Sequence, residues 1–278
     1  MTWLGIALGL LSAAIFGVAA VVQARAVRGF DSSPDGLWAF VTRSVRDRRT
    51  MAVVAAYLVG FVLHAAAIWL LPLYLAQALV AMSLPVTAMA SHRVEDSLPR
   101  SGWAAVGVVT LGLVFLSLGA GDPGDVVTHT TFVAVLWVGV AALALASMAN
   151  GRLPGPLLGL LAGLGYAGSA IAVRGVGTPL SAGVVVAALA VPSFSLVAFW
   201  LYSLGMHRAA VPATTASLIV AQTFVPAAVG VAVLGDGVRD GWWPAVVVGL
   251  LLATGGAAVL GVRSSASPAT SSSPDPVR

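Results

Sequence analysis

The sequence predicts an all-α polytopic membrane protein with about nine transmembrane helices. Of its 278 residues, 59% are hydrophobic and only 9% are charged, whereas about one quarter of the residues in a soluble domain are charged. Nine apolar segments recur, each close to the roughly 20 residues that a helix needs to cross a hydrocarbon core about 30 Å thick. Because charge does not interrupt them, they are typical of helices and not of alternating barrel strands. They cover residues 2–22, 51–71, 73–91, 102–120, 130–149, 155–174, 181–204, 212–234 and 243–262.

The arginines predict how these segments are oriented. The chain has no Lys, and its formal net charge is +4. One set of connections, together with the tail, carries most of the basic residues: Arg25, Arg28, Arg43, Arg46, Arg48, Arg49, Arg93, Arg100, Arg152, Arg208, Arg263 and Arg278. The other set holds only Arg174 and Arg239. By the positive-inside rule, we expect the N-terminus outside and the C-terminus in the cytoplasm, and we do not expect a nucleic-acid partner.

Two regions outside the apolar segments have a character of their own. In the 23–50 connection, Leu37, Trp38, Val41 and Val45 recur at helical spacing behind Pro34, which predicts a short helix at the membrane interface. The Ser/Pro-rich residues 263–278 cannot bury a core, so we expect a disordered cytoplasmic tail. The first apolar segment lacks the positive flank of a signal peptide and is interpreted as a retained span.

Small residues at four-residue spacing indicate an internal repeat. The ladder occurs in the first and sixth segments and comprises Gly5, Gly9, Ala13 and Gly17, then Gly155, Gly159, Gly163 and Ala167. Such ridges let helix backbones approach closely in lipid. A second correspondence joins "SLPVTAMASHRVEDS" to "TFVPAAVGVAVLGDG", and it pairs Pro85 with Pro226.

These correspondences predict an inverted repeat of four, one and four helices. The first half is 1–120, the linking helix lies in 121–150, and the second half is 151–262. A single linking span reverses the second copy relative to the first. This architecture supports alternating access in many secondary transporters, with the substrate near the midplane.

The two prolines predict the site. Pro85 and Pro226 each remove a backbone donor, which is expected to loosen the helices at Ala81 and Gln222. Irregular backbone at membrane depth is tolerated where it lines a cavity. The candidate pathway residues are therefore His64, Gln77, Ser83, Pro85, Thr87, Ser217, Gln222, Thr223 and Pro226. The alternatives are hydroxyls that bond to their own helical turn, and glutamines or a neutral histidine that join helices.

Two stretches of the sequence resemble members of a known superfamily. "SLPVTAMASHRVEDSLPRSGWAAVGVVTLGLVFLSLG" and "FVPAAVGVAVLGDGVRDGWWPAVVVGLLLATGGAAVLG" resemble the Pro helix, acidic turn and Gly-rich helix of EamA-like permeases in the drug/metabolite transporter superfamily. "GIALGLLSAAIFGVAAVVQARAVR" through "AIWLLPLYLAQALVAMSLPV" is also similar to the NIPA-like magnesium transporters. The resemblance implies a ten-helix, five-plus-five fold, from which one N-terminal helix is absent here, with residues 34–49 as its shortened remnant.

Charge placement favours a permease for a small metabolite. None of the ten acids lies inside an apolar segment, so a carboxylate proton relay is not evident, and a magnesium site would depend on Glu95, Asp96, Asp236 or Asp240 at a mouth. His64 is the one titratable side chain well inside a span, and a proton switch there is a hypothesis. A divalent-cation transporter and a non-transporting scaffold remain alternatives. No enzyme motif occurs, and no metal site or cofactor is expected.

We expect the partners to be the lipid bilayer of a bacterial cytoplasmic membrane and an unidentified small molecule. A homodimer is left open.

Overall fold

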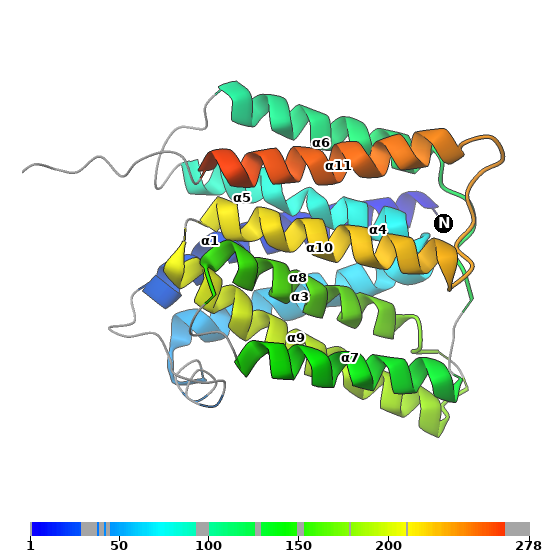
Figure 1. Ribbon diagram of the computed structural model, residues 1–278, viewed down its shortest axis with the longest axis horizontal. Coiled ribbons are helices and arrows are strands. Elements are labelled where there is room, and N and C mark those ends of the chain that lie inside the picture. Colours follow the sequence, from blue (N-terminus) through cyan, green and yellow to red (C-terminus); the bar gives the residue numbers. More distant parts are fainter. Residues whose placement is uncertain are drawn as a thin grey trace, which may run out of the picture.

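The computed structural model describes residues 2–28, 38, 42, 45–92, 100–125, 129–148, 153–177, 179–209 and 211–264. Within these ranges the regular secondary structure is helical, apart from one isolated bridge between Ala120 and Val238. The helices run side by side as a bundle (Figure 1). In chain order they are α1 (Thr2–Arg28), α3 (Arg48–Leu70), α4 (Leu73–Ala81), α5 (Ser83–His92), α6 (Arg100–Leu118), α7 (Thr130–Met148), α8 (Gly155–Val173), α9 (Ala182–Arg208), α10 (Val211–Ala232) and α11 (Trp243–Ser264).

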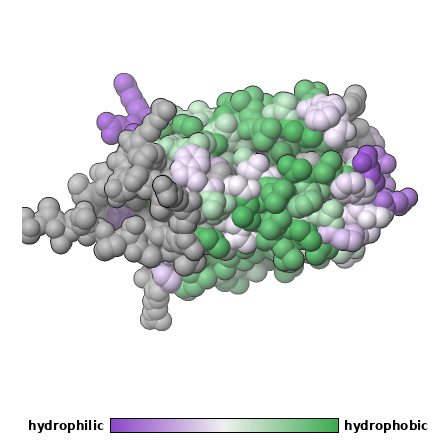
Figure 2. Space-filling model, turned by 90° about the horizontal axis from the view of Figure 1, so that it is seen from above, coloured by the Kyte–Doolittle hydropathy of each residue, from purple (hydrophilic) through white to green (hydrophobic). Residues whose placement is uncertain are grey.

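Six of the described helices are long and apolar enough to cross a membrane, namely α1, α3, α7, α8, α9 and α10. Shorter apolar helical stretches at Leu73–Thr87, Trp103–Leu116 and Trp243–Gly256 cover the remaining predicted segments. Figure 2 shows hydrophobic residues around the middle of the molecule and hydrophilic residues at its right-hand end. The fold is therefore consistent with a multi-pass membrane protein. We call the end where α1 begins the N-terminal end and the end where α11 finishes the C-terminal end (Figure 1).

Only one of the two proline helices is interrupted. The third predicted segment divides into α4 and α5 at Met82, whose N–H donates to the Leu79 carbonyl, 3.1 Å away, in a tightened turn. This break is adjacent to Ala81, where Pro85 removes a donor. The expected break at Gln222 is wrong, because α10 runs through Pro226 as one helix. A helix can lose one backbone hydrogen bond to proline and still continue with a bend.

The helices pack in two similar groups. In the first, α1 lies against α3, α4 and α5, and in the second α8 lies against α9 and α10. Helix α7 covers α8 and α9, while α6 pairs with α11 across the two groups. The buried apolar side chains form two clusters, one mainly among α8, α9 and α10 and the other mainly of α3 and α4.

The glycine ladders lie at the closest helix contacts. A Cβ placed on Gly9 would lie 2.7 Å from Leu79 of α4, and one on Gly17 would lie 2.6 Å from Val86 of α5. The corresponding atoms on Gly159 and Gly163 would each lie 2.3 Å from a carbonyl oxygen of α10. Each ladder therefore packs a small-residue face against the proline-bearing helix of its own group, where a larger side chain would not fit. The other ladder positions, Gly5, Ala13, Gly155 and Ala167, are also buried.

The starts of α3 and α4 are capped in different ways. Asp47 accepts hydrogen bonds from the N–H groups of Arg49 and Thr50 at the start of α3. Its carboxylate also accepts the Thr50 hydroxyl at 2.6 Å, and this bond holds the pKa of Asp47 below its ordinary value. At the start of α4, Pro72 makes no side-chain cap. The donors there must find partners elsewhere in the molecule.

Some predictions fall outside the described residues. In the 23–50 connection, residues 29–37, 39–41, 43 and 44 do so, which includes Pro34, Leu37 and Val41 of the predicted interfacial helix, although Trp38, Thr42, Val45 and Arg46 are helical. Glu95 and Asp96 of the first acidic turn also lie outside, as does the tail beyond Ser264.

Candidate functional site

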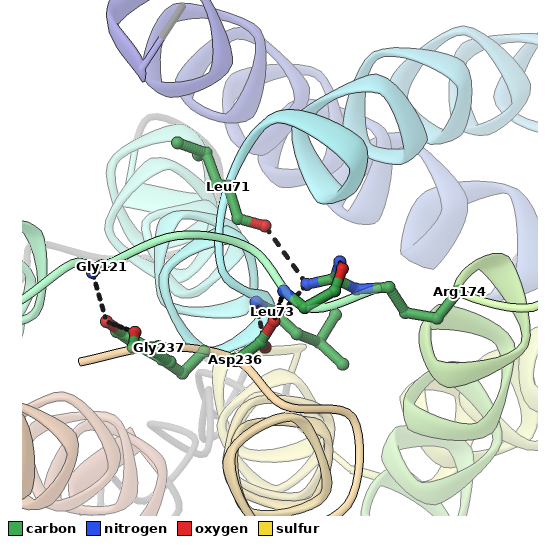
Figure 3. Close-up of polar contacts among 8 residues, drawn as sticks. Leu71, Leu73, Gly121, Arg174, Asp236 and Gly237 are labelled. Atoms are coloured by element: carbon green, nitrogen blue, oxygen red, sulfur yellow. Dashed lines mark hydrogen bonds and ion pairs between the residues drawn. The ribbon is translucent and has the colours of Figure 1, made fainter. Parts of the chain in front are cut away.

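A buried ion pair within the second half of the chain lies at the N-terminal end, where both of its partners also bond to the first half. Arg174 follows α8 and Asp236 follows α10, and their side chains are 3% and 0% exposed. One guanidinium nitrogen of Arg174 donates to Oδ1 of Asp236 at 2.5 Å (Figure 3). The same nitrogen lies 3.4 Å from the Leu71 carbonyl, and the other terminal nitrogen donates to the Gly124 carbonyl at 2.7 Å. Arg174 thus reaches three separate connections between helices.

Asp236 supplies the cap that α4 lacks. Its Oδ2 accepts the Leu73 N–H at 2.6 Å, and its Oδ1 accepts the Gly124 N–H at 2.8 Å (Figure 3). A carboxylate at a helix N-terminus is favoured by both the free N–H groups and the helix dipole. Both carboxylate oxygens are therefore occupied. We call Arg174, Asp236, Leu71, Leu73 and Gly124, with their hydrogen bonds, the latch.

Two glycines bring Asp236 into this position. Gly235 has φ of +75°, a left-handed conformation that glycine adopts without steric cost, and it turns the chain after α10. The Asp236 N–H then donates back to the Gly230 carbonyl at 3.0 Å. A Cβ on Gly230 would clash with Oδ2 of Asp236, so this position must also be small. The turn and the glycine together place the carboxylate beneath α4.

Connections beside the latch close the same end further. The Tyr74 hydroxyl contacts the carbonyls of Gly119 and Gly237 at 3.1 and 3.2 Å. The Gly121 N–H donates to the Gly237 carbonyl at 3.3 Å (Figure 3). The Gly237 N–H in turn donates to the Asp122 carbonyl at 2.9 Å. The 119–125 and 233–242 connections are therefore held together by backbone hydrogen bonds over the start of α4.

The structure brings two predicted pathway residues together in the bundle interior. His64 of α3 and Gln77 of α4 are 6% and 2% exposed, and their side-chain nitrogens lie 3.0 Å apart. If the Gln77 amide donates, the imidazole Nε2 accepts and Nδ1 carries the proton. That Nδ1 is buried without a hydrogen-bond partner. Phe16 lies edge-on to the His64 ring, with the ring centroids 6.4 Å apart.

The other predicted residues are buried, apart from the half-buried Ser217, and do not form one cluster with this pair. Thr87 donates to the Ser83 carbonyl at 2.8 Å, and Ser217 donates to the Ala213 carbonyl at 3.2 Å, as expected for hydroxyls that bond to their own turn. Thr223 differs, because its hydroxyl is buried without a partner. Among the described residues, no hydrogen bond links Gln222 or Thr223 to His64 or Gln77. Ser83, Pro85, Gln222 and Pro226 are also buried.

Sequence reasoning missed a second polar group, which lies towards the C-terminal end. Gln23 of α1 donates through its amide to the Ser203 hydroxyl of α9 at 2.6 Å, and it is 1% exposed. Nearby in the sequence, the Tyr202 hydroxyl lies 2.6 Å from that of Thr215. Gln23 lies just after the first predicted apolar segment, in the connection that the sequence predicts at 23–50. Extension of α1 to Arg28 places this amide inside the bundle.

The described acids all lie at helix ends or in connections: Asp47, Asp122, Asp125, Asp236 and Asp240. Within the described part of the chain, no group of three or more His, Cys, Asp or Glu side chains is arranged to hold a metal ion. The hydrogen-bonding side chains of the described bundle interior, away from Arg174 and Asp236, include amides, hydroxyls, one imidazole and the Trp200 indole. Such groups orient an uncharged ligand by hydrogen bonds within a mostly apolar lining.

Comparison with known proteins adds no relative: no family model, no curated protein and no solved structure matches this chain.

Proposed function

We propose that this protein is a secondary-active permease that moves a small metabolite across the membrane by alternating access. The observation that carries the proposal is the contrast between the latch and the interior of the bundle. At the N-terminal end, the latch ties the two halves of the chain together through both carboxylate oxygens of Asp236, and Nε of Arg174 is the latch atom that is buried without a partner. Away from the latch, buried polar atoms of Gln23, His64 and Thr223 have no partner. A transporter closed at one end would leave such groups for a solute or water.

The arrangement of the helices supports an inverted repeat of four, one and four spans. Helix α1 packs on the two-part helix α4–α5 as α8 packs on α10. In both groups a glycine ladder forms the contact. Helix α7 packs on α8 and α9 of the second group, as expected for a linking span. In this scheme the nine helical segments all cross the membrane, and each group moves relative to the other about the midplane.

The drug/metabolite transporter architecture fits the proposal. The order of a proline helix, a turn that carries an acid and a Gly-rich helix is present in the second half, from Pro226 through Asp236 to α11. In this scheme the protein resides in the cytoplasmic membrane, with the N-terminal end outside. The arginine distribution supports that orientation. The latch would then be an extracellular closure.

The proposal is tested by cysteine accessibility, because the natural chain contains no cysteine. Leu71→Cys reports on the latch, and Ala24→Cys reports on α1 near Gln23; both side chains are buried. Each is introduced into the wild-type chain and into Asp236→Asn, in nanodiscs, and is labelled with a membrane-impermeant maleimide. We expect the substitution at Asp236 to speed labelling of Leu71→Cys and to slow labelling of Ala24→Cys. Opposite changes at the two ends are the signature of alternating access.

Asp240→Asn is the matched control, because Asp240 is an exposed carboxylate in the same connection. It should leave both labelling rates unchanged. If Asp236→Asn leaves both rates unchanged or raises both together, the two ends are not coupled and the permease proposal is wrong.

A further inference from the structure

Three helices meet at a group of side chains that the predicted pathway did not include. Gln23 of α1 donates to Ser203 of α9, and Ser203 donates to the Phe199 carbonyl at 2.8 Å. The Phe199 ring lies edge-on to Tyr57 of α3, with centroids 5.7 Å apart. Tyr57 also stacks on Phe16 of α1 at a centroid distance of 5.7 Å. These five residues, Phe16, Gln23, Tyr57, Phe199 and Ser203, are called the aromatic–amide group.

Two polar atoms of this group are buried without a partner, Oε1 of Gln23 and the hydroxyl of Tyr57. The orientation of the Gln23 amide follows from its neighbour. Ser203 gives its hydrogen to the Phe199 carbonyl, so the Gln23 atom facing Ser203 must be the donor nitrogen. The acceptor oxygen Oε1 of Gln23 is then the atom without a hydrogen-bond partner. Leaving a buried carbonyl oxygen or a buried hydroxyl without a hydrogen bond costs free energy. Two such atoms in one group therefore indicate that a ligand binds there and supplies the missing hydrogen bonds.

The chemistry around these atoms selects the ligand. The group contains no charged side chain, and the described acids lie at helix ends or in connections. Burying an organic cation or anion without a counter-charge would be unfavourable in a membrane interior. An uncharged solute with a hydrogen-bond donor for Gln23 and a flat apolar face for the rings meets no such cost.

We propose that the aromatic–amide group binds an uncharged solute that combines a flat ring with hydrogen-bond donors, such as a nucleoside. This inference rests on the proposed permease function and names the substrate class for it. Gln23 and Tyr57 supply the two hydrogen bonds, while Phe16 and Phe199 supply apolar contact. No covalent step is involved.

The test uses the purified full-length chain and measures equilibrium binding by calorimetry. The probes are adenosine and uridine, their 5′-monophosphates as anionic analogues, and tyramine as a cationic one. We expect at least one nucleoside to bind and the charged analogues to bind at least tenfold more weakly. Gln23→Leu and Tyr57→Phe should each weaken nucleoside binding by about threefold to tenfold, as expected for one lost hydrogen bond.

Thr254→Val is the control, since the Thr254 hydroxyl donates to the Leu250 carbonyl of its own helix, α11, which does not contribute to the group, and it should not affect binding. The proposal is overturned if neither nucleoside binds, if a charged analogue binds more tightly, or if Thr254→Val causes an equal loss. A thermal unfolding midpoint that stays at the wild-type value shows that each variant is folded.

The two proposals can fail separately. If nucleoside binding depends on Gln23 but cysteine labelling does not change in opposite directions at the two ends, the binding-site proposal is supported and the permease proposal is wrong. If labelling changes in opposite directions but no nucleoside binds, the permease proposal is supported and this substrate class is wrong.

Discussion

The Asp236 carboxylate caps a helix that begins 163 residues earlier in the chain, at Leu73. It does so while paired with Arg174, so a single side chain joins the start of α4 to the end of α8. Because the charges are buried, neither partner has water as an alternative. The latch is therefore expected to contribute to both the stability of the fold and the closure of the N-terminal end.

Removing one charge of the latch should be strongly destabilising. Arg174→Met leaves the Asp236 carboxylate buried without its counter-charge, and we expect a loss of about 3–5 kcal/mol in the free energy of unfolding. Arg174→Met combined with Asp236→Leu should recover part of that loss, because no buried charge remains. Denaturant unfolding in detergent measures both. A single variant as stable as wild type would contradict the geometry described for the pair.

Gly230 and Gly255 should respond in opposite ways to alanine. In Gly230→Ala the new Cβ meets Oδ2 of Asp236, so the latch must shift and the apparent melting temperature should fall. At Gly255, in α11, nothing lies within 4 Å of such a Cβ. There alanine should be neutral or stabilising by up to about 1 kcal/mol, since helical glycine carries an entropic penalty. Equal effects at the two sites would argue against steric contact at Gly230.

Substitution by alanine should destabilise the protein more in the glycine ladder of α8 than at Gly107 of α6, where a Cβ would have free space. Gly163→Ala places a Cβ 2.3 Å from the Leu218 carbonyl, so α8 and α10 must separate. We expect a loss of about 1–3 kcal/mol, as for overpacked cores. Gly107→Ala is the control, because its Cβ would meet nothing within 4 Å. Thermal unfolding of the two variants in the same detergent compares them directly.

Asp47 should make stability depend on pH at the acid end. Its pKa is lowered in the folded protein, chiefly by the Thr50 hydroxyl, so its stabilising effect is present above the unfolded pKa of about 4. That contribution is lost as the pH falls through the folded pKa. Asp47→Ala should cost about 1 kcal/mol at pH 7 and progressively less below pH 4. A difference between wild type and variant that grows towards low pH would reverse the assigned sign.

The interior amides and imidazole should affect transport more than folding. If the permease proposal holds, His64→Ala, Gln77→Ala and Gln222→Ala should each lower uptake into proteoliposomes of the solute identified by binding. Ser193→Ala is the control, because Ser193 is half-buried on α9 and its hydroxyl bonds to the Leu189 carbonyl of its own helix. Unchanged uptake in all three variants, with the wild-type unfolding midpoint retained, would remove these residues from the pathway.

Several features of the fold could be predicted from the sequence because they depend on local composition. Length and hydropathy locate the apolar segments, since the helix rise sets how many residues a span requires. The four-residue spacing of Gly9 and Gly17, or of Gly159 and Gly163, identifies a helix face that can be approached closely. Pro85 marked the neighbourhood of the interruption at Met82 because the missing donor is a property of that residue alone.

Other features depend on contacts between distant segments. Pro226 also lacks a donor, yet α10 is continuous, so whether a helix breaks depends on its surroundings as well as on the proline. The sequence places Arg174 and Asp236 in two separate connections and Gln23 in a third, because each of these residues is polar and lies at the edge of an apolar segment or beyond it. Local hydropathy thus determined the helices of this protein, while the tertiary structure alone decided which buried polar groups meet. The reason is that hydrogen bonds and ion pairs form between atoms that are adjacent in space. Gln23 and Ser203, for example, are bonded at a sequence separation of 180.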